Sequence, residues 1–383
     1  MQEWQIFTPE YPTRLGGVSD YTKLLAAALS AAGDRVHVWY PETESTVLPV
    51  PGVCLHPQAG RLTPLDLWPM GRELDRIPRP RLLLVQWVPH GYGCRSMNLP
   101  FCLWLWGRAR LHGDQVEIMV HEPFLAFGEG NWRQNLVAVV HRLMTIILLR
   151  AAKKVRVAIP AWERCWKPYL LRKKVTFEWS PVPSNVPVVE DPAAVSAIRQ
   201  RYASNSDILF GSFGTFGLPT TRLLEPILQV MCGPLSGNSI ILIGKDSEAF
   251  RRRVVEGNPS YASRVHATGT LPPEDLSRHI SACDILIQPY PDGVSSRRSS
   301  VMAGLCHGKP IVTTVGTLTE PLWAESGAVV LGPVGDTDAL VAQMRYLANH
   351  RDTRELLATR AKALYDERFS LQRLVVALRR SSA

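Results

Sequence analysis

The segment from Pro289 to Thr314, PYPDGVSSRRSSVMAGLCHGKPIVTT, combines residue types that bind phosphate. An apolar strand, Ile285–Gln288, runs into a polar loop, and a helix of small residues begins near Ser299. A helix N-terminus carries unpaired N–H groups and partial positive charge, and guanidinium groups bind diphosphates through parallel hydrogen bonds. The alternative is a capped helix with two solvated arginines. The loop offers Asp292, Gly293, Ser295, Arg297, Arg298, Ser299 and Ser300.

Two further segments have glycines where a backbone could approach a ligand closely. Gly16 and Gly17 stand in YPTRLGGVSDY, between the first expected strand and the first expected helix. Gly214 stands in GSFGTFG, after the first expected strand of the second half. A pair of glycines is also typical of an ordinary turn, and neither segment is a G-x-G-x-x-G fingerprint.

Two titratable residues follow expected strands. His121 ends the strand Val116–Val120, where an imidazole could donate to a reacting hydroxyl or act as an acid or base. Glu320 follows the strand Pro310–Thr313 and could accept hydrogen bonds from ligand hydroxyl groups. The alternatives are a hydrogen-bonded structural histidine and an acid that stabilises a helix N-terminus.

Strands and helices alternate along most of the chain, and the alternation restarts after the proline-rich stretch Trp179–Val189. This order predicts an α/β protein with two Rossmann-like domains, whose parallel sheets are covered by helices on both faces. We expect domains at 1–183 and 184–367, with a final helix at about 368–383 that packs back on the first domain. Ligands of such sheets bind at the carboxyl ends of the strands, which here predicts a cleft between the domains.

The composition is that of a globular protein: 383 residues, 46% of them hydrophobic and 20% charged. The net charge of +9 fits an anionic ligand, a nucleic acid or an anionic membrane surface, but no run of basic and aromatic residues suggests nucleic acid. Seven scattered cysteines without a C-x-x-C pair indicate neither a disulfide framework nor a zinc site.

We expect a cytoplasmic protein, because no signal peptide is evident at Met1–Ile6. The apolar stretch Leu136–Leu149 is interrupted by His141 and Arg142 and is shorter than the roughly twenty residues that span a bilayer. Contact with the inner face of a membrane stays open, since the basic stretches KKVR from Lys153 and RKK from Arg172 could touch anionic lipid.

The order of these features resembles the GT-B glycosyltransferases, especially the retaining group 1 or GT4-like family. The resemblance covers nearly the whole chain and is carried by GGVSDYT, SPVPSNV, RVHATGTLPPEDLSRHISACDILIQPY and GKPIVTT. It implies transfer of a sugar from a nucleotide-sugar donor to a sugar, lipid-linked or small-molecule acceptor, without a metal or other cofactor. It also implies that Gly16 and Gly17 approach the donor diphosphate, that His121 contacts the donor sugar and that the backbone near Gly269–Leu271 meets the base.

The sequence departs from the family pattern at its most characteristic positions. Ser295 and Ala303 stand where the family has two glutamates eight positions apart, and Ser212 and Gly217 stand where it has an arginine and a lysine. The diphosphate charge would then be met by other residues. The substitutes that we expect are Arg297 and Arg298, ahead of Arg222 and Lys245, with Asp292 in place of the first glutamate.

Two other activities fit the same resemblance. Some GT-B proteins are nucleotide-sugar epimerases, which convert the donor without an acceptor. The loss of both motif glutamates also fits a degenerate nucleotide-sugar binding protein. We expect His121, Arg297 and Arg298 to be the catalytic residues of a transferase. The expected donor-binding residues are Gly16, Gly17, Gly214, Lys245, Gly269, Leu271, Asp292, Gly293, Ser295, Ser299, Ser300 and Glu320.

Overall fold

The computed structural model describes residues 1–12, 16–41, 49–57, 62–128, 131–204, 207–231 and 238–381. Part of the predicted glycine segment, Thr13–Leu15, lies outside the described residues, as do Cys232 and the last two residues of the chain. The chain divides into two compact units: Met1–Pro181 with Leu371–Ala383, and Val182–Ser370. We describe each unit by itself.

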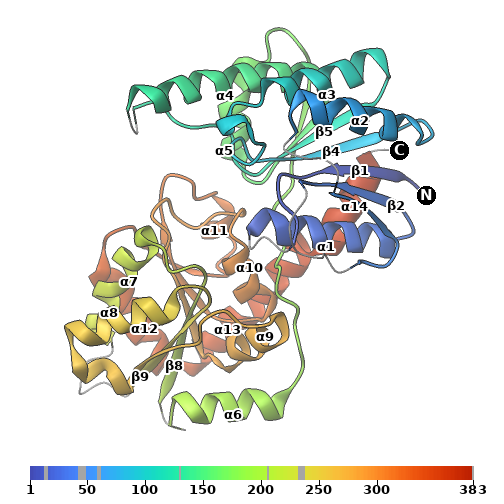
Figure 1. Ribbon diagram of the computed structural model, residues 1–383. Coiled ribbons are helices and arrows are strands. Elements are labelled where there is room, and N and C mark those ends of the chain that lie inside the picture. The colour runs from blue at the N-terminus through green and yellow to red at the C-terminus, as the bar shows by residue number, and fades with distance from the viewer. Residues whose placement is uncertain are drawn as a thin grey trace. The chain divides into compact units, whose positions relative to one another are not determined.

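Unit 1 has a parallel sheet of seven strands in the order β3-β2-β1-β4-β5-β6-β7 (Figure 1). Its central strand β4, LLLVQW, is buried throughout, as expected for a parallel strand that is covered on both faces. The strands are β1 (Glu3–Phe7), β2 (Arg35–Trp39), β3 (Val53–His56), β4 (Leu82–Trp87), β5 (Gln115–Val120), β6 (Ala152–Val157) and β7 (Thr176–Trp179).

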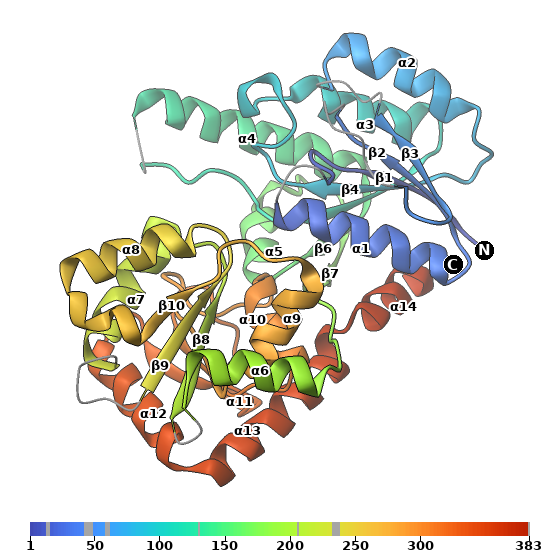
Figure 2. The ribbon, with the colours of Figure 1, turned by 60° about the horizontal axis from the view of Figure 1, so that its bottom comes forward.

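The helices of unit 1 cover the two faces of this sheet. Right-handed crossovers place α1 on one face and α3 and α4 on the other, because β1→β2 and β4→β5→β6 run in opposite directions along the sheet. Figures 1 and 2 show α3 beside α4 and α14 beside α1. The helices are α1 (Gly17–Ala31), α2 (Pro64–Asp75), α3 (Leu99–Leu111), α4 (Trp132–Ala151), α5 (Pro160–Trp166) and α14 (Leu371–Ser381), with short 3-10 helices at Cys94–Ser96 and Lys167–Tyr169.

The last helix, α14, completes unit 1. Arg379 pairs with the buried carboxylate of Asp34 at 3.2 Å, and its backbone carbonyl accepts a hydrogen bond from Gln2 Nε2 at 3.1 Å. The units divide at Pro181–Val182, and the chain returns to unit 1 at Leu371. The structure thus places these boundaries within three residues of positions 183 and 368.

Unit 2 has a parallel sheet of six strands in the order β10-β9-β8-β11-β12-β13. An apolar core packs between this sheet and α7, α8, α12 and α13. The strands are β8 (Ile208–Phe213), β9 (Asn238–Ile243), β10 (Val265–Ala267), β11 (Ile285–Gln288), β12 (Ile311–Val315) and β13 (Val330–Pro333).

The helices of unit 2 form packed pairs, with α6 against α9 (Figure 2) and α7 against α12. They are α6 (Pro192–Tyr202), α7 (Leu218–Met231), α8 (Ser247–Gly257), α9 (Pro273–Ala282), α10 (Ser299–Cys306), α11 (Leu322–Glu325), α12 (Thr337–Asn349) and α13 (Arg351–Leu364), with a 3-10 helix at Pro259–Ser263 and a π-helical turn at Tyr365–Phe369. Two α/β units with parallel sheets confirm the predicted fold class.

The apolar stretch Leu136–Leu149 lies inside a longer helix, α4. This helix has 20 residues and is long and apolar enough to cross a membrane by length and composition alone, which the stretch by itself is not. Asn131 caps this helix by accepting hydrogen bonds from the N–H groups of Arg133 and Gln134. Its inner face, which includes His141, Met144 and Leu148, is buried in unit 1.

Candidate functional site

Backbone hydrogen bonds join three loops at the carboxyl edge of the unit 2 sheet. Gly214, after β8, donates its N–H to Ile243 O at 3.1 Å, and Gly244, after β9, donates to Gly269 O at 3.1 Å. Gly244 has φ +121, and a Cβ there would lie 2.3 Å from Gly214 O. The structure therefore brings Gly214, Lys245 and Gly269 to one edge, where the Lys245 side chain is exposed. Leu271 follows two residues after Gly269 and is half-buried.

The loop after β11 holds two guanidinium groups on one carboxylate. Arg297 donates to Asp292 Oδ2 and Arg298 donates to Asp292 Oδ1, so both carboxylate oxygens are engaged. The Arg298 guanidinium also lies 4.8 Å from the centre of the Tyr290 ring. The three charged side chains are partly exposed and sum to a net charge of +1. The two arginines are thus oriented by Asp292 and not merely solvated.

A close approach of two glycines fixes this loop against the loop that follows β12. Gly293 has φ +83, and a Cβ on it would lie 2.2 Å from Gly316 N. A Cβ on Gly316 would in turn lie 2.7 Å from the carbonyl carbon of Asp292. Leu318 N–H donates to Asp292 O at 2.9 Å. Glycine is required at both positions because the two backbones touch.

Glu320 connects the same two loops from the inside. Its carboxylate accepts hydrogen bonds from the backbone N–H and the hydroxyl of Ser296, and from Trp323 Nε1 at 2.8 Å. Both carboxylate oxygens are therefore occupied by protein donors, and the residue is buried. Glu320 therefore holds the arginine loop in place through Ser296, and its carboxylate oxygens are not left free to accept hydrogen bonds from a ligand. Sequence reasoning missed Ser296 and Trp323, which carry no motif signal of their own.

The first turn of α10 lies directly after the arginine pair. Ser299 and Ser300 begin the helix, and its first N–H groups have no partner within the helix. The Ser300 hydroxyl lies 2.7 Å from Tyr290 Oη, and burial raises the pKa of Tyr290 to about 12, which keeps the phenol neutral. Ser295 is also buried, and its hydroxyl has no hydrogen-bond partner among the described residues. Ala303 is buried inside α10.

His121 lies at the carboxyl edge of the other sheet, in unit 1. Its Nε2 is 2.8 Å from Gln86 Oε1, and its ring meets the Tyr21 ring edge-on at 4.8 Å between centres. Burial lowers the pKa of His121 to about 4, against a small opposing effect of Glu122. The imidazole is therefore neutral at physiological pH. With the Gln86 amide as oriented here, Nε2 carries the proton and Nδ1 is left as an acceptor.

Helix α1 of unit 1 begins at Gly17, and Gly16 is its N-cap residue. The Glu10 carboxylate accepts a hydrogen bond from Ser19 N at 3.2 Å, and a Cβ on Gly16 would lie 2.3 Å from Glu10 Oε1. Glu10 thus occupies part of the helix N-terminus, where the sequence predicts a diphosphate. Sequence reasoning missed this residue, although an acid shortly before a Gly-Gly helix start is a readable signal.

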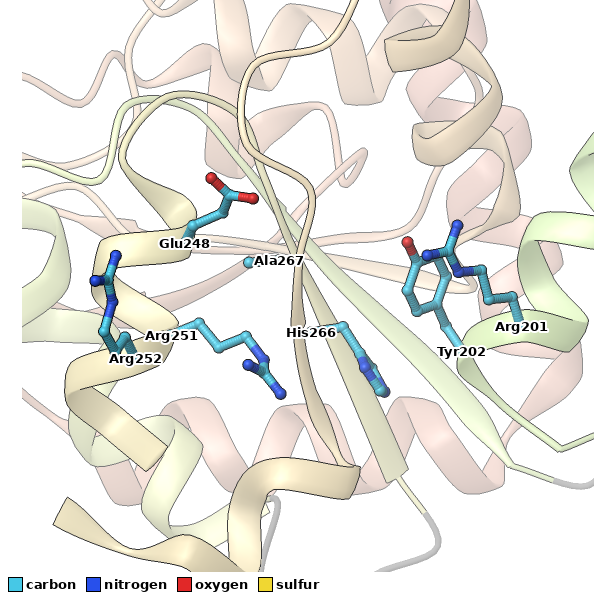
Figure 3. Close-up of a pocket in the computed structure, with 7 residues that line it drawn as sticks. All are labelled: Arg201, Tyr202, Glu248, Arg251, Arg252, His266 and Ala267. Atoms are coloured by element: carbon cyan, nitrogen blue, oxygen red, sulfur yellow. The ribbon is translucent and has the colours of Figure 1, made fainter. Parts of the chain in front are cut away.

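A separate pocket of about 580 Å³ straddles the edge strand β10 (Figure 3). Figure 3 shows Glu248, Arg251 and Arg252 on the α8 side of the strand and Arg201 and Tyr202 on the other side. Burial and the neighbouring arginines lower the pKa of His266 in the pocket wall. None of the site residues expected from the sequence lines this pocket.

No group of three or more His, Cys, Asp or Glu side chains that could hold a metal ion occurs within the described ranges. The cysteines of those ranges are free thiols. That the chain works without a metal stays a prediction.

No family model and no curated protein matches the sequence. Solved structures are similar over the whole chain. Sucrose-phosphate synthase from Thermosynechococcus elongatus is 18% identical with a TM-score of 0.74, and the match covers 100% of this chain and 98% of that one. HepE from Anabaena, in complex with UDP and glucose, is 15% identical with a TM-score of 0.68 and coverage of 99% and 100%.

WaaG, a glycosyltransferase involved in lipopolysaccharide biosynthesis, is 13% identical with a TM-score of 0.65 and coverage of 99% and 98%. These similarities span both parallel-sheet units of the chain and not one unit alone. The chain therefore has the GT-B fold of these glycosyltransferases.

Proposed function

We propose that this protein transfers a glycosyl group from a nucleotide-sugar donor to an acceptor hydroxyl. The observation that carries the proposal is the cluster of Asp292, Arg297 and Arg298 next to the first turn of α10. Oriented guanidinium groups beside a helix N-terminus form a binding site for a diphosphate. A structurally similar protein, HepE, has been solved with UDP and with UDP-glucose, which supports a nucleotide sugar as the ligand.

The chemistry follows from charge. Cleavage of the bond between sugar and diphosphate leaves negative charge on the nucleoside diphosphate, and fixed cations and N–H dipoles stabilise that charge. Arg297, Arg298, Ser299 and Ser300 would supply these groups. Gly293 would let the backbone approach the phosphates, and the loops at Gly214, Lys245 and Gly269–Leu271 would hold the nucleoside. We propose that the reaction proceeds with retention and without a metal ion.

Unit 1 would hold the acceptor, which we expect to be a sugar, a lipid-linked sugar or a small molecule. His121 would act there as a neutral hydrogen-bonding group, since its pKa of about 4 excludes an imidazolium at neutral pH. Its Nδ1 is an acceptor for a hydroxyl group. Glu320 and Asp292 would act on the donor site as positioning residues, by holding Ser296 and the two guanidinium groups.

The test combines binding and turnover. Isothermal titration with UDP, GDP and ADP and their sugar derivatives should find one preferred nucleoside diphosphate. The R297A/R298A double variant should lose that binding by at least tenfold, because two charge-assisted contacts are removed. The matched control is R351A, which removes an exposed arginine of unit 2 that pairs with Glu355.

Mass spectrometry of reactions with acceptor mixtures then distinguishes the alternatives. A glycosylated acceptor supports the transferase. Conversion of the donor to its epimer without an acceptor would identify an epimerase, and donor binding with no product would identify a binding protein. Unchanged turnover in R297A/R298A, with a product formed, would contradict the role of the arginine pair.

A further inference from the structure

The outer face of α4 carries an apolar strip that no described part of unit 1 covers. Trp132, Leu136, Val139 and Leu143 follow one another at the spacing of a single helix face. Their exposed fractions are 71%, 51%, 45% and 47%. We call these four residues the α4 strip. On the neighbouring helix α3, Leu103 and Trp106 are exposed as well, so both packed helices carry exposed apolar side chains.

Arg142 lies in the middle of α4 but does not interrupt this strip. Its guanidinium donates to Leu125 O and Ala138 O and lies over the rings of Phe124 and Phe127, at 4.4 Å and 3.7 Å from their centres. The charge is thus drawn aside to the loop before α4. Phe127 itself is 52% exposed and adds to the apolar surface near the start of the helix.

A basic groove of about 680 Å³ lies at the other end of α4, where β5 and β6 begin. Among the described residues that line it, the one carboxylate is that of Asp114, whose side chain is fully buried and binds Arg81 and Arg108. That carboxylate is therefore not available to the cations that face the groove. These cations are Arg110, Arg150, Lys153, Arg172, Lys173 and Lys174.

Most charges in this basic groove have no acidic partner within the part of the chain that the structure describes. Among the residues that the structure describes, the side chains of Arg110, Arg150, Arg172 and Lys174 make no hydrogen bond or ion pair. Lys173 donates to Arg150 O and Ala152 O at the end of α4. Burial, with the nearby charges of Arg110 and Arg150, lowers the pKa of Lys173. Among the described residues, the cations that face the groove therefore outnumber its carboxylates, and the one lining carboxylate, Asp114, is already paired with Arg81 and Arg108.

The basic groove follows the α4 strip along the same helix. Arg150 follows Leu143 at seven residues, which keeps it on the same helix face. Trp106 and Leu171 line the groove and are themselves exposed, so apolar side chains reach its rim. A helix of 20 residues is about 30 Å long, and the sequence of α4 contains no acidic residue over that length.

We propose that this surface docks unit 1 on an anionic lipid bilayer, with α4 lying in the interface and the basic groove taking a lipid phosphate. An apolar strip flanked by cations is the chemistry that binds such interfaces, and exposed tryptophan favours the boundary between headgroups and acyl chains. A protein partner would need acidic groups along the groove and an apolar counterpart along α4, whereas an anionic bilayer supplies both at once.

The helix lies on the surface rather than crossing the bilayer. Its inner face buries Ala138, His141, Met144, Thr145 and Leu148 against unit 1. Insertion across a membrane would expose His141 and Thr145 to hydrocarbon and break the contact with α3. Lying flat, α4 keeps its inner face in the protein and places only the strip in lipid.

Docking would also present the acceptor side of the proposed site. The α4 strip begins with Trp132, which follows the loop that runs from His121 at the carboxyl edge of the sheet. With α4 flat on the bilayer, the carboxyl edge that carries His121 would open sideways, close to the membrane surface at the Trp132 end of the helix. This consequence rests on the proposed function, but the docking itself does not.

The experiment uses the full chain and co-sedimentation with vesicles of phosphatidylcholine, with or without phosphatidylglycerol. Wild type should sediment only with the anionic vesicles, and added salt should release it. The groove variant R150Q/K174Q should bind about 25-fold more weakly, because each basic residue near an anionic surface strengthens binding about fivefold. The strip variant L136Q/L143Q should also lose at least tenfold. Hydrogen exchange should show vesicle-dependent protection of α4 in wild type and not in the strip variant.

The matched control is R201Q/R252Q, which removes two charges from the pocket of Figure 3, a basic site without an apolar strip. It should bind vesicles like wild type. All substituted side chains are exposed or partly exposed, and circular dichroism checks their folding. Equal sedimentation with neutral vesicles, or wild-type binding by L136Q/L143Q, would overturn the proposal. So would binding of inorganic phosphate in the groove by a protein that does not bind vesicles.

Discussion

The carboxylate of Glu320 accepts hydrogen bonds from both the backbone N–H and the hydroxyl of Ser296, 24 residues earlier in the chain. This contact joins the loop after β12 to the loop that carries Arg297. Because Ser296 immediately precedes Arg297, the position of the guanidinium depends on a carboxylate that faces away from solvent. Glu320 therefore controls the site without needing to touch a ligand.

Replacing Glu320 with glutamine should weaken both the fold and the site. The amide would turn a donor toward groups that already donate, which leaves a buried N–H unpaired and costs about 1–3 kcal/mol of unfolding free energy. Affinity for the nucleoside diphosphate should fall together with stability. Urea unfolding and isothermal titration measure the two effects. The exposed acid Glu325 provides the control E325Q. If E320Q bound the nucleoside diphosphate like wild type, Glu320 would not be needed to position the arginine loop.

Replacing Asp292 with asparagine should separate binding from turnover. The cluster of Asp292, Arg297 and Arg298 would change from a net charge of +1 to +2, so binding of a diphosphate should strengthen by about fivefold at low salt. Turnover should fall, because the guanidinium groups lose the carboxylate that orients them. Titration at two salt concentrations and steady-state kinetics measure both. Weaker binding in D292N than in the exposed control D338N would show that orientation outweighs charge.

The strand–helix order could be predicted because buried parallel strands such as β4 and β11 are continuous apolar runs. Other elements have no comparable signal. Helix α3 places apolar and basic residues on every side, so its sequence shows no periodic face, and α6 buries none of its residues fully. The short edge strands β7 and β13 are only four residues long. Tertiary packing, rather than local pattern, defines these elements.

The candidate site, like the fold, could be predicted from the sequence only in part. The arginine loop could be predicted from residue types and from its place after an apolar strand. The partners of Glu320 and Asp292 could not, because a sequence does not show the direction of a side chain across 24 residues. Glu320 was predicted to accept from a ligand, but its oxygens are used inside the protein. At the start of α1, the carboxylate of Glu10, which is not part of the helix, accepts a hydrogen bond from Ser19 N.

His121 should make stability, but not catalysis, depend on pH. The unfolded chain binds this proton near pH 6.5, whereas the folded protein binds it only near pH 4. Between these values the unfolded state holds more protons, so unfolding free energy falls as pH falls, by up to about 3 kcal/mol. The variant H121N should lose less stability between neutral pH and pH 4 than wild type does.

Proton NMR of the His121 ring and urea unfolding at several pH values test this. Burial also lowers the pKa values of His37, His56 and His141. These residues are present in wild type and in H121N, so their contributions to the pH dependence of stability cancel when the two proteins are compared. Turnover should show no step from His121 over the range in which an unperturbed histidine titrates. An NMR midpoint near pH 6.5 would contradict the buried neutral ring.

Gly293 should be far less tolerant of alanine than another glycine with nearly the same backbone angle. Gly293 and Gly335 have φ +83 and +85, but a Cβ on Gly293 would lie 2.2 Å from Gly316 N, whereas nothing lies within 4 Å of one on Gly335. G335A should cost only the left-handed penalty of about 1–2 kcal/mol and keep nucleoside diphosphate binding. G293A should cost about 1–3 kcal/mol more and abolish binding, since the Asp292 loop must move away from Gly316.

Urea unfolding gives the two stabilities, and titration gives the two affinities. Because both substitutions change the unfolded chain in the same way, their difference isolates the contact between the loops. Equal costs would mean that backbone conformation alone requires glycine at position 293. A larger cost with intact binding would mean that the packed loops stabilise unit 2 without positioning Arg297 and Arg298. If G293A loses both stability and nucleoside diphosphate binding, the contact of Gly293 with Gly316 is part of the ligand site.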